Sequence, residues 1–316
     1  MKYLQQASLG KRSYFRYILT IFILVAIIPV FGQLTYYVGM SIVGVSSSQL
    51  ADYTLAQSRD IMGKNLFLIV NLFPFVVLFF AMLLAIRFIH QRATLSIFTA
   101  RPTFDWKRFF FSFGLFGLIL CIGLAHTLLT TKTTLWNYHP ETFWMLMGLS
   151  FFVLPLQTAF EELMFRGYML QGSIRLLKKP IAAVLISSFL FAVLHFENPE
   201  VKKLGEVLVI YYFASGLFMS LLTVLDNGLE LSLGFHTVNN IFGTLILTNN
   251  WQVFQTDALY MDTSDPVIGW DLWIIVLVIY PLMLFIFHKV YKWKTWSEVL
   301  FETVELEDED QKEDDL

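Results

Sequence analysis

Apolar residues run through this chain in stretches long enough to cross a lipid bilayer, which takes about 20 residues of helix. Six stretches are clear and cover residues 17–40, 65–86, 109–131, 207–225, 231–248 and 272–287. Two further stretches, 143–160 and 181–194, are apolar but each meets ionisable residues at its end. The pattern predicts an all-α, polytopic membrane protein of about eight transmembrane helices, two of which are interrupted by residues that carry chemistry.

Composition and charge agree with a membrane protein. Of the 316 residues, 56% are hydrophobic and 15% are charged, against roughly 25% charged in a soluble domain. Nine acids and one base lie in residues 302–316, which predicts a disordered acidic tail. The rest of the chain carries an excess of five bases, spread between apolar runs, and this gives no basic stripe for a nucleic acid. The single cysteine, Cys121, excludes a disulfide or a Cys-based zinc site within one chain.

The basic residues also predict an orientation. They gather before the first helix, between the second and third, between the fourth and fifth, and after the last. Because Lys and Arg concentrate in cytoplasmic loops, an even helix count leaves both termini in the cytoplasm. The first apolar stretch is too long for a signal peptide and lacks a small-residue cleavage site, so we expect a retained helix.

Ionisable groups inside a membrane helix cost several kcal/mol and are functional-site hypotheses by default. Three segments carry the candidates, which are Glu161, Glu162, Arg166, His195, His236 and Asn240. If residues 178–180 form a helical hairpin, Glu161 and His195 lie equally far along antiparallel neighbours, about 25 Å from the turn. Asn240 follows His236 by one turn of the same helix face. The sequence therefore predicts one site within the helical bundle.

The spacing separates two roles within the first segment. Glu162 and Arg166 are four residues apart, which suits an internal ion pair. Glu161 points about 100° away from Glu162, so it is the better candidate for a chemically free carboxylate. The alternative is that both glutamates cap the end of the fourth helix and that His195 only packs between helices.

A carboxylate beside an imidazole can hold a water molecule and take its proton. A second imidazole and an amide, here His236 and Asn240, can donate hydrogen bonds to the oxyanion of a tetrahedral intermediate. This set favours a hydrolase. The chain contains no His-Glu-x-x-His, Gly-x-Ser-x-Gly or Gly-x-Gly-Asp motif, which disfavours other intramembrane hydrolases.

Three motifs in this order on successive helices, Glu161-Glu162-x-x-x-Arg166, Phe191-x-x-x-His195 and His236-x-x-x-Asn240, resemble those of the CPBP family of CAAX-processing and bacteriocin-processing (Abi) intramembrane proteases, which include type II CAAX endopeptidases. The resemblance covers about residues 143–249. It implies an eight-span helical fold and endopeptidase activity on a peptide or protein substrate within membrane lipids. It also implies that Glu161 and His195 activate water, while His236 and Asn240 stabilise the oxyanion.

The resemblance leaves the metal and the substrate open. Family members are usually labelled metalloproteases, and Glu161, His195 and His236 could form a zinc set with an open position, yet the same residues suffice without a metal. Eukaryotic members trim prenylated CAAX tails, whereas many bacterial members serve bacteriocin maturation, immunity or signal processing. The compact chain favours a bacterial cell-membrane protein.

Four regions are expected along the chain. Residues 1–142 form an N-terminal three-helix membrane region, 143–249 the protease core, 250–301 the last transmembrane helix and cytoplasmic end, and 302–316 the tail. The competing hypothesis is a non-catalytic scaffold, an immunity protein or a small-peptide transporter that uses the same polar cavity. A transporter would favour paired inverted halves, and the sequence has no such internal symmetry.

Overall fold

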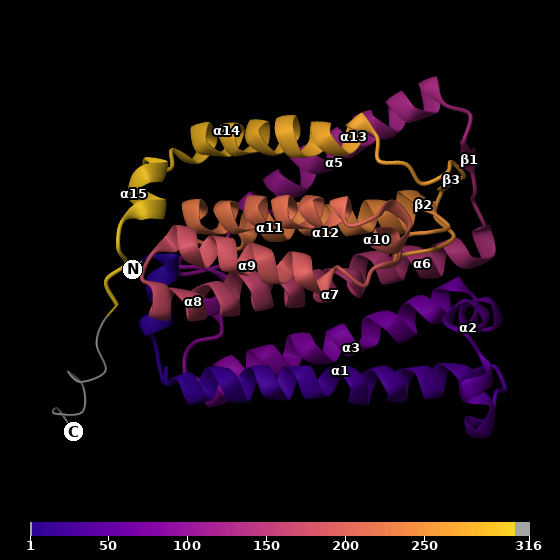
Figure 1. The fold of residues 1–316 in the computed structure, drawn as a ribbon, viewed down its shortest axis with the longest axis horizontal. Helices are drawn as coiled ribbons and strands as arrows, with labels where there is room; N and C mark the ends of the chain where they lie inside the picture. The colour runs from indigo at the N-terminus through magenta and orange to yellow at the C-terminus, as the bar shows by residue number, and fades with distance from the viewer. Residues whose placement is uncertain (1, 307–316) are drawn as a thin grey trace.

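The computed structural model describes residues 2–306. Long helices lie side by side in three layers, with α1 (Tyr14–Ile42) and α3 (Lys64–Leu84) in the outer layer at the bottom of Figure 1. The middle layer holds α7 (Leu154–Glu162), α8 (Leu170–Leu177), α9 (Pro180–Leu194), α11 (Val207–Asp226) and α12 (Glu230–Ile241). The third layer holds α5 (Trp106–Thr130), α13 (Trp270–Ile274) and α14 (Tyr280–Tyr291). The expected tail lies mostly outside the described residues, which end at Leu306.

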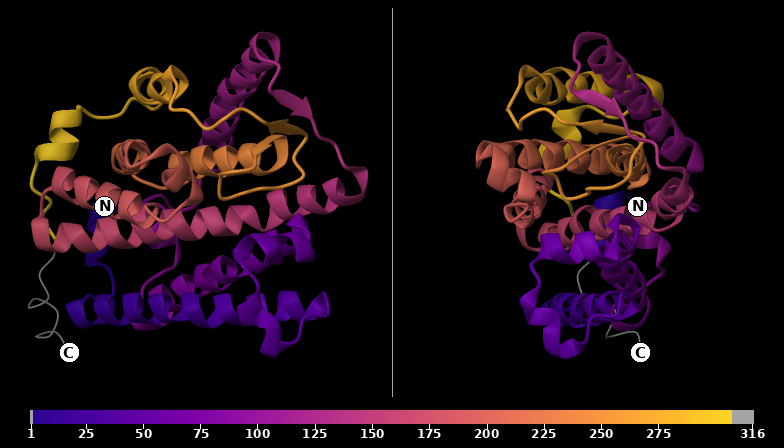
Figure 2. Two further views of the ribbon diagram at one scale, coloured as in Figure 1. Left: turned by 45° about the vertical axis from the view of Figure 1, so that its right-hand side comes forward. Right: turned by 90° about the vertical axis from the view of Figure 1, so that its right-hand side faces the viewer.

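Short elements complete the chain. The remaining α-helices are α2 (Leu55–Met62), α4 (Leu95–Phe98), α6 (Pro140–Phe152), α10 (Pro199–Leu204) and α15 (Trp296–Phe301). The 3₁₀-helices are η1 (Tyr3–Ser8) and η2 (Ser47–Asp52), and the π-helices are η3 (Ala85–Ile89), η4 (Leu163–Met169), η5 (Phe242–Ile246) and η6 (Ile275–Ile279). The 3₁₀-helix η1 and α15 lie at one end of the bundle and the small sheet lies at the other, as Figure 1 and the left view of Figure 2 show.

Within the described residues, six helical segments are long and apolar enough to cross a membrane. They are Tyr14–Ile42, Lys64–Ile89, Trp106–Thr130, Pro140–Leu177, Val207–Asp226 and Leu272–Tyr291. Pro180–Leu194 is a shorter apolar helix. The predicted fold class, an all-α polytopic membrane protein, is therefore confirmed, but the count of eight is not. The seventh predicted segment, 231–248, contains most of α12, which carries polar side chains along its length and is buried in the protein over residues 230–238.

One predicted helix boundary is wrong. The stretch 231–248 leaves the helical conformation at Ile246, and Leu247–Asn249 forms strand β2. This strand pairs in parallel with β3 (Tyr260–Asp262), which pairs antiparallel with β1 (Thr134–Trp136). An apolar run alone does not reveal such a strand, because its hydrogen-bond partners lie in segments far along the chain.

Two turns align the helices that carry the candidate residues. Lys178 ends α8 in the left-handed conformation, and Pro180 opens α9, so the predicted hairpin is present. Asn227 ends α11 in the same conformation before α12 begins. At Gly234 of α12, an added Cβ would lie 2.2 Å from the carbonyl oxygen of Phe109. Only glycine permits this close approach of α12 to α5, and it brings the following residues of α12 toward the bundle interior.

Candidate active site

The first motif lies where an α-helix changes to a π-helix. Glu162 is the last residue of α7, and Arg166 belongs to η4. Both side chains are fully buried, and Nη1 of Arg166 lies 3.0 Å from Oε1 of Glu162. The guanidinium also lies 4.2 Å from the centre of the Phe191 ring and donates through Nη2 to the carbonyl oxygen of Gly216 at 3.4 Å. The predicted ion pair is thus confirmed, within a π-helical turn of the kind often found at functional sites.

His236 joins the two glutamates. Its Nδ1 lies 2.9 Å from Oε1 of Glu162, and its Nε2 lies 3.5 Å from Oε2 of Glu161. A carboxylate only accepts hydrogen bonds, so a ring nitrogen of His236 that carries a proton donates toward the glutamate that it faces. The side chain of Glu161 keeps 15% of its surface exposed, whereas that of Glu162 keeps none. Glu161 is therefore the more exposed carboxylate of this pair.

His195 lies at the end of α9 and has a different environment. Its Nδ1 lies 2.7 Å from the carbonyl oxygen of Phe191. Because a carbonyl oxygen only accepts, this contact places the ring proton on Nδ1 and leaves Nε2 as a proton acceptor. The Phe191 ring lies 4.3 Å from the His195 ring and 6.2 Å from the His236 ring, measured between centroids.

The pairing of acid and base thus differs from the expected one. Glu161 lies against His236, and no hydrogen bond or ion pair joins Glu161 to His195 within the described part of the chain. Phe191 contacts both imidazoles, so His195 belongs to the same neighbourhood without touching the carboxylate. The reason is rotational, because His195 turns its Nδ1 back onto its own helix.

Asn240 brings in a residue that the sequence argument missed. Its amide nitrogen donates to Oε1 of Gln157 at 3.2 Å. Gln157 lies on α7 four residues before Glu161, and it is buried. Its signal was a polar side chain one turn from a candidate carboxylate. Gly216, whose carbonyl accepts from Arg166, gave no such signal because its role is played by the backbone.

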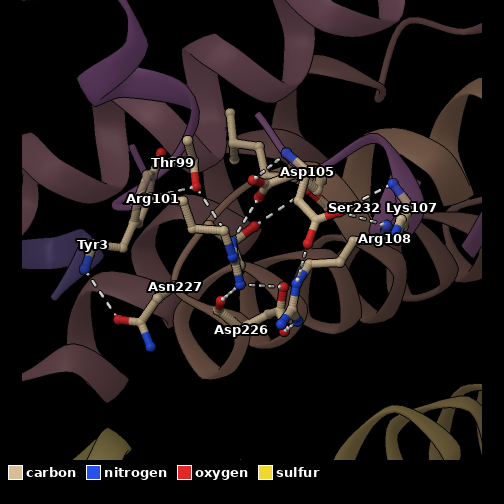
Figure 3. Close-up of polar contacts among 12 residues, drawn as sticks. Tyr3, Thr99, Arg101, Asp105, Lys107, Arg108, Asp226, Asn227 and Ser232 are labelled. Atoms are coloured by element: carbon tan, nitrogen blue, oxygen red, sulfur yellow. Dashed lines mark hydrogen bonds and ion pairs between the residues drawn. The ribbon is translucent and has the colours of Figure 1, made fainter. Parts of the chain in front are cut away.

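A second ionic cluster fixes the start of α12, as Figure 3 shows for Arg101, Arg108 and Asp226. Arg101 lies 3.0 Å from Oδ2 of Asp226 and 3.0 Å from Oε2 of Glu230. Arg108 forms an ion pair with the other carboxylate oxygen of Asp226. Asp226 ends α11 and Glu230 begins α12. These contacts hold the turn between the two helices, and with it the position of His236.

The candidate zinc ligands do not assemble. Among the described residues, no group of three His, Cys, Asp or Glu side chains is placed to hold a metal ion. The residues as arranged do not fit the zinc set formed by Glu161, His195 and His236.

Comparisons with known proteins point to the same segment. Residues 140–242 match the family model of type II CAAX prenyl endopeptidase Rce1-like proteins. The chain is also 32% identical over 173 residues to the Bacillus subtilis (strain 168) protein YyaK, which is described as uncharacterized. That match spans 54% of this chain and 58% of YyaK. No solved structure matches the chain. The predicted resemblance is therefore confirmed over residues 140–242, and this helical membrane protein carries all six candidate residues within a segment similar to the Rce1-like membrane proteases.

Proposed function

We propose that the protein is an intramembrane endopeptidase of the CAAX-processing type, which hydrolyses peptide bonds of membrane-associated peptides or proteins. The observation that carries the proposal is the contact of the partly exposed Glu161 with His236, beside the buried Glu162–Arg166 pair. A solely structural ion pair has no need of a second carboxylate that remains exposed. The similarity of residues 140–242 to a protease family supports the same reading.

Glu161 and His195 activate the attacking water in this proposal. Glu161 is the carboxylate that water reaches, and Nε2 of His195 is the unprotonated ring nitrogen. Either group can take a proton from water held between them. Glu162 and Arg166 act as positioning residues, because Glu162 holds Nδ1 of His236 and Arg166 balances the charge of Glu162.

His236 and Asn240 stabilise the oxyanion. The 3.5 Å separation of Nε2 of His236 from Glu161 is long for a direct hydrogen bond, so this N–H remains available to a developing negative charge. Asn240 presents its amide from the next turn of α12, where Gln157 holds it. Loss of one such donor typically costs about 10²–10³ in rate, and we expect that range for Asn240→Ala.

The location follows from the same reading. We propose a bacterial cell membrane with both termini in the cytoplasm, which the basic clusters and the similarity to a Bacillus subtilis protein support. In a Cys121→Ser background, a cysteine at position 178 should react with a membrane-impermeant thiol reagent only from the cytoplasm. A cysteine at position 137, at the opposite end of the bundle, should react only from outside. Labelling of position 178 from outside would overturn the orientation.

The activity is tested with purified wild type and Glu161→Gln. Both are given quenched peptides with a C-terminal CAAX sequence, farnesylated in one arm and unprenylated in the other, and membranes of cells expressing each form are compared by peptidomics. We expect cleavage by wild type and by Glu197→Gln, a control in an exposed ion pair, and none by Glu161→Gln. Equal peptide patterns in wild type and Glu161→Gln would refute the proposal. In a parallel arm, activity that is lost with a chelator and recovered with added zinc would contradict the statement that Glu161, His195 and His236 do not fit a zinc site.

A further inference from the structure

Tyr212 is the residue that the mechanism above does not use and that lies directly against one of its bases. Its ring centroid is 4.3 Å from that of His195, with 31° between the planes. Phe191 lies at the same centroid distance from His195. Among the described residues no ring contact joins Phe191 to Tyr212, so the imidazole of His195 contacts two separate aromatic rings.

The hydroxyl of Tyr212 is itself held in place. It donates to Oε1 of Glu200 and accepts from the amide of Asn198 at 3.2 Å. The same amide donates to Oε1 of Glu200 at 3.1 Å. The backbone N–H of Asn198 donates to the carbonyl oxygen of His195 at 3.1 Å. These contacts form a closed network that runs from the imidazole of His195 through residues 195–200 to Tyr212 and back to the imidazole.

Glu200 connects this network of contacts to a segment farther along the chain. Its other oxygen, Oε2, accepts from the backbone N–H of Val253 at 3.1 Å. Val253 lies between strands β2 and β3. Glu200 is half-buried at the start of α10, where both of its carboxylate oxygens are used by α11 and by the loop after β2. A surface glutamate without a role would not be expected to bind two separate elements.

We propose that Tyr212, held by Glu200, is a positioning residue that fixes the ring of His195 for proton transfer from water. This inference rests on the proposed function. The hydrogen bond of Nδ1 to Phe191 sets the tautomer, but an imidazole can still rotate about this contact. Contact with the rings of Phe191 and Tyr212 opposes that rotation, and the hydrogen bond of the hydroxyl to Glu200 fixes the ring of Tyr212. A base displaced by about 1 Å can lose about 10² in rate.

The test separates the ring from the hydroxyl. Tyr212→Leu removes the stacking, and we expect kcat to fall about 10²-fold while KM changes little. Tyr212→Phe keeps the ring and loses both hydrogen bonds of the hydroxyl, with Glu200 and with Asn198, and we expect kcat to fall about 3- to 10-fold. Glu200→Ala should match Tyr212→Phe. Because Glu200 acts through the hydroxyl of Tyr212, the kcat of the double variant, Tyr212→Phe with Glu200→Ala, should fall no further than that of either single variant. Tyr37→Leu, the same substitution at an exposed position of α1, is the control and should keep wild-type kcat.

Three outcomes would overturn the inference. They are wild-type kcat in Tyr212→Leu, multiplied losses in the double variant, and an equal loss in Tyr212→Phe and Tyr212→Leu. If Tyr212→Leu does not fold, the comparison of Tyr212→Phe and Glu200→Ala with their double variant tests the inference by itself. The ring NMR signals of ¹⁵N-histidine-labelled protein, with His195 assigned by His195→Gln, should shift in Tyr212→Leu whether or not a substrate is known. An unchanged His195 signal would refute the contact, whereas a shifted signal without wild-type cleavage would refute the proposed function instead.

Discussion

Replacing Arg166 by methionine should destabilise the protein strongly, although the substitution changes no residue on the surface. The guanidinium is fully buried, lies 3.0 Å from the equally buried Glu162 and stacks 4.2 Å above Phe191. Removing one partner of a buried ion pair costs about 3–5 kcal/mol, because the other charge stays buried without compensation. The ring contact adds about 0.5–2 kcal/mol. His236 still faces Glu162 in the variant, so we expect a total loss near the lower end, about 3–4 kcal/mol.

Equilibrium unfolding in mixed detergent micelles would measure this loss. The double variant Arg166→Met with Glu162→Gln removes both charges, so it should lie closer to wild type than Arg166→Met alone. Lys202→Ala breaks an exposed ion pair with Glu197 and should change stability by less than about 1 kcal/mol. A loss below about 1 kcal/mol in Arg166→Met, or a double variant that is worse than the single one, would refute the reasoning from a buried pair.

Substitutions at three further positions, Gly234, Tyr3 and His90, test the packing and the burial of polar groups in the bundle. Gly234→Ala places a Cβ against the backbone of α5, so it should lower the free energy of unfolding by about 1–3 kcal/mol and lower turnover. Gly243→Ala is the control, because its added Cβ meets nothing within 4 Å, and it should have the melting temperature of wild type. Tyr3 is fully buried and donates to the carbonyl oxygen of Ile97 at 2.6 Å, so thermal unfolding should show a loss of about 1–2 kcal/mol in Tyr3→Phe and about 3–5 kcal/mol in Tyr3→Ala. Burial, with a smaller effect of the neighbouring Arg92, lowers the pKa of His90 to about 4. The unfolded chain therefore binds a proton below pH 6.5 that the folded protein does not, so the melting temperature should fall between pH 6.5 and 4, and His90→Gln should fall less steeply.

The sequence by itself determined the membrane class and one ion pair of the candidate site. Apolar length is a local property, so five of the six long spans in the described residues match clear apolar runs, and the sixth, Pro140–Leu177, contains the interrupted stretch 143–160. The ion pair of Glu162 with Arg166 also followed, since residues four apart on a helix are neighbours. The hairpin at Lys178 was readable from the basic pair and the proline after it. These features share one cause, which is that the interacting residues are close in sequence.

Only the tertiary structure decided which groups face one another. Depth along a helix placed Glu161, His195 and His236 at one level, but it could not give the rotation of each helix about its axis. That rotation put His236 against Glu161 and turned His195 toward Phe191. It also brought Gln157 to Asn240 and Tyr212 to His195. The end of the seventh predicted helix at Ile246 depended likewise on a strand partner farther along the chain. Side-chain orientation across helices is set by packing against distant segments, and residue spacing within one helix carries no information about it.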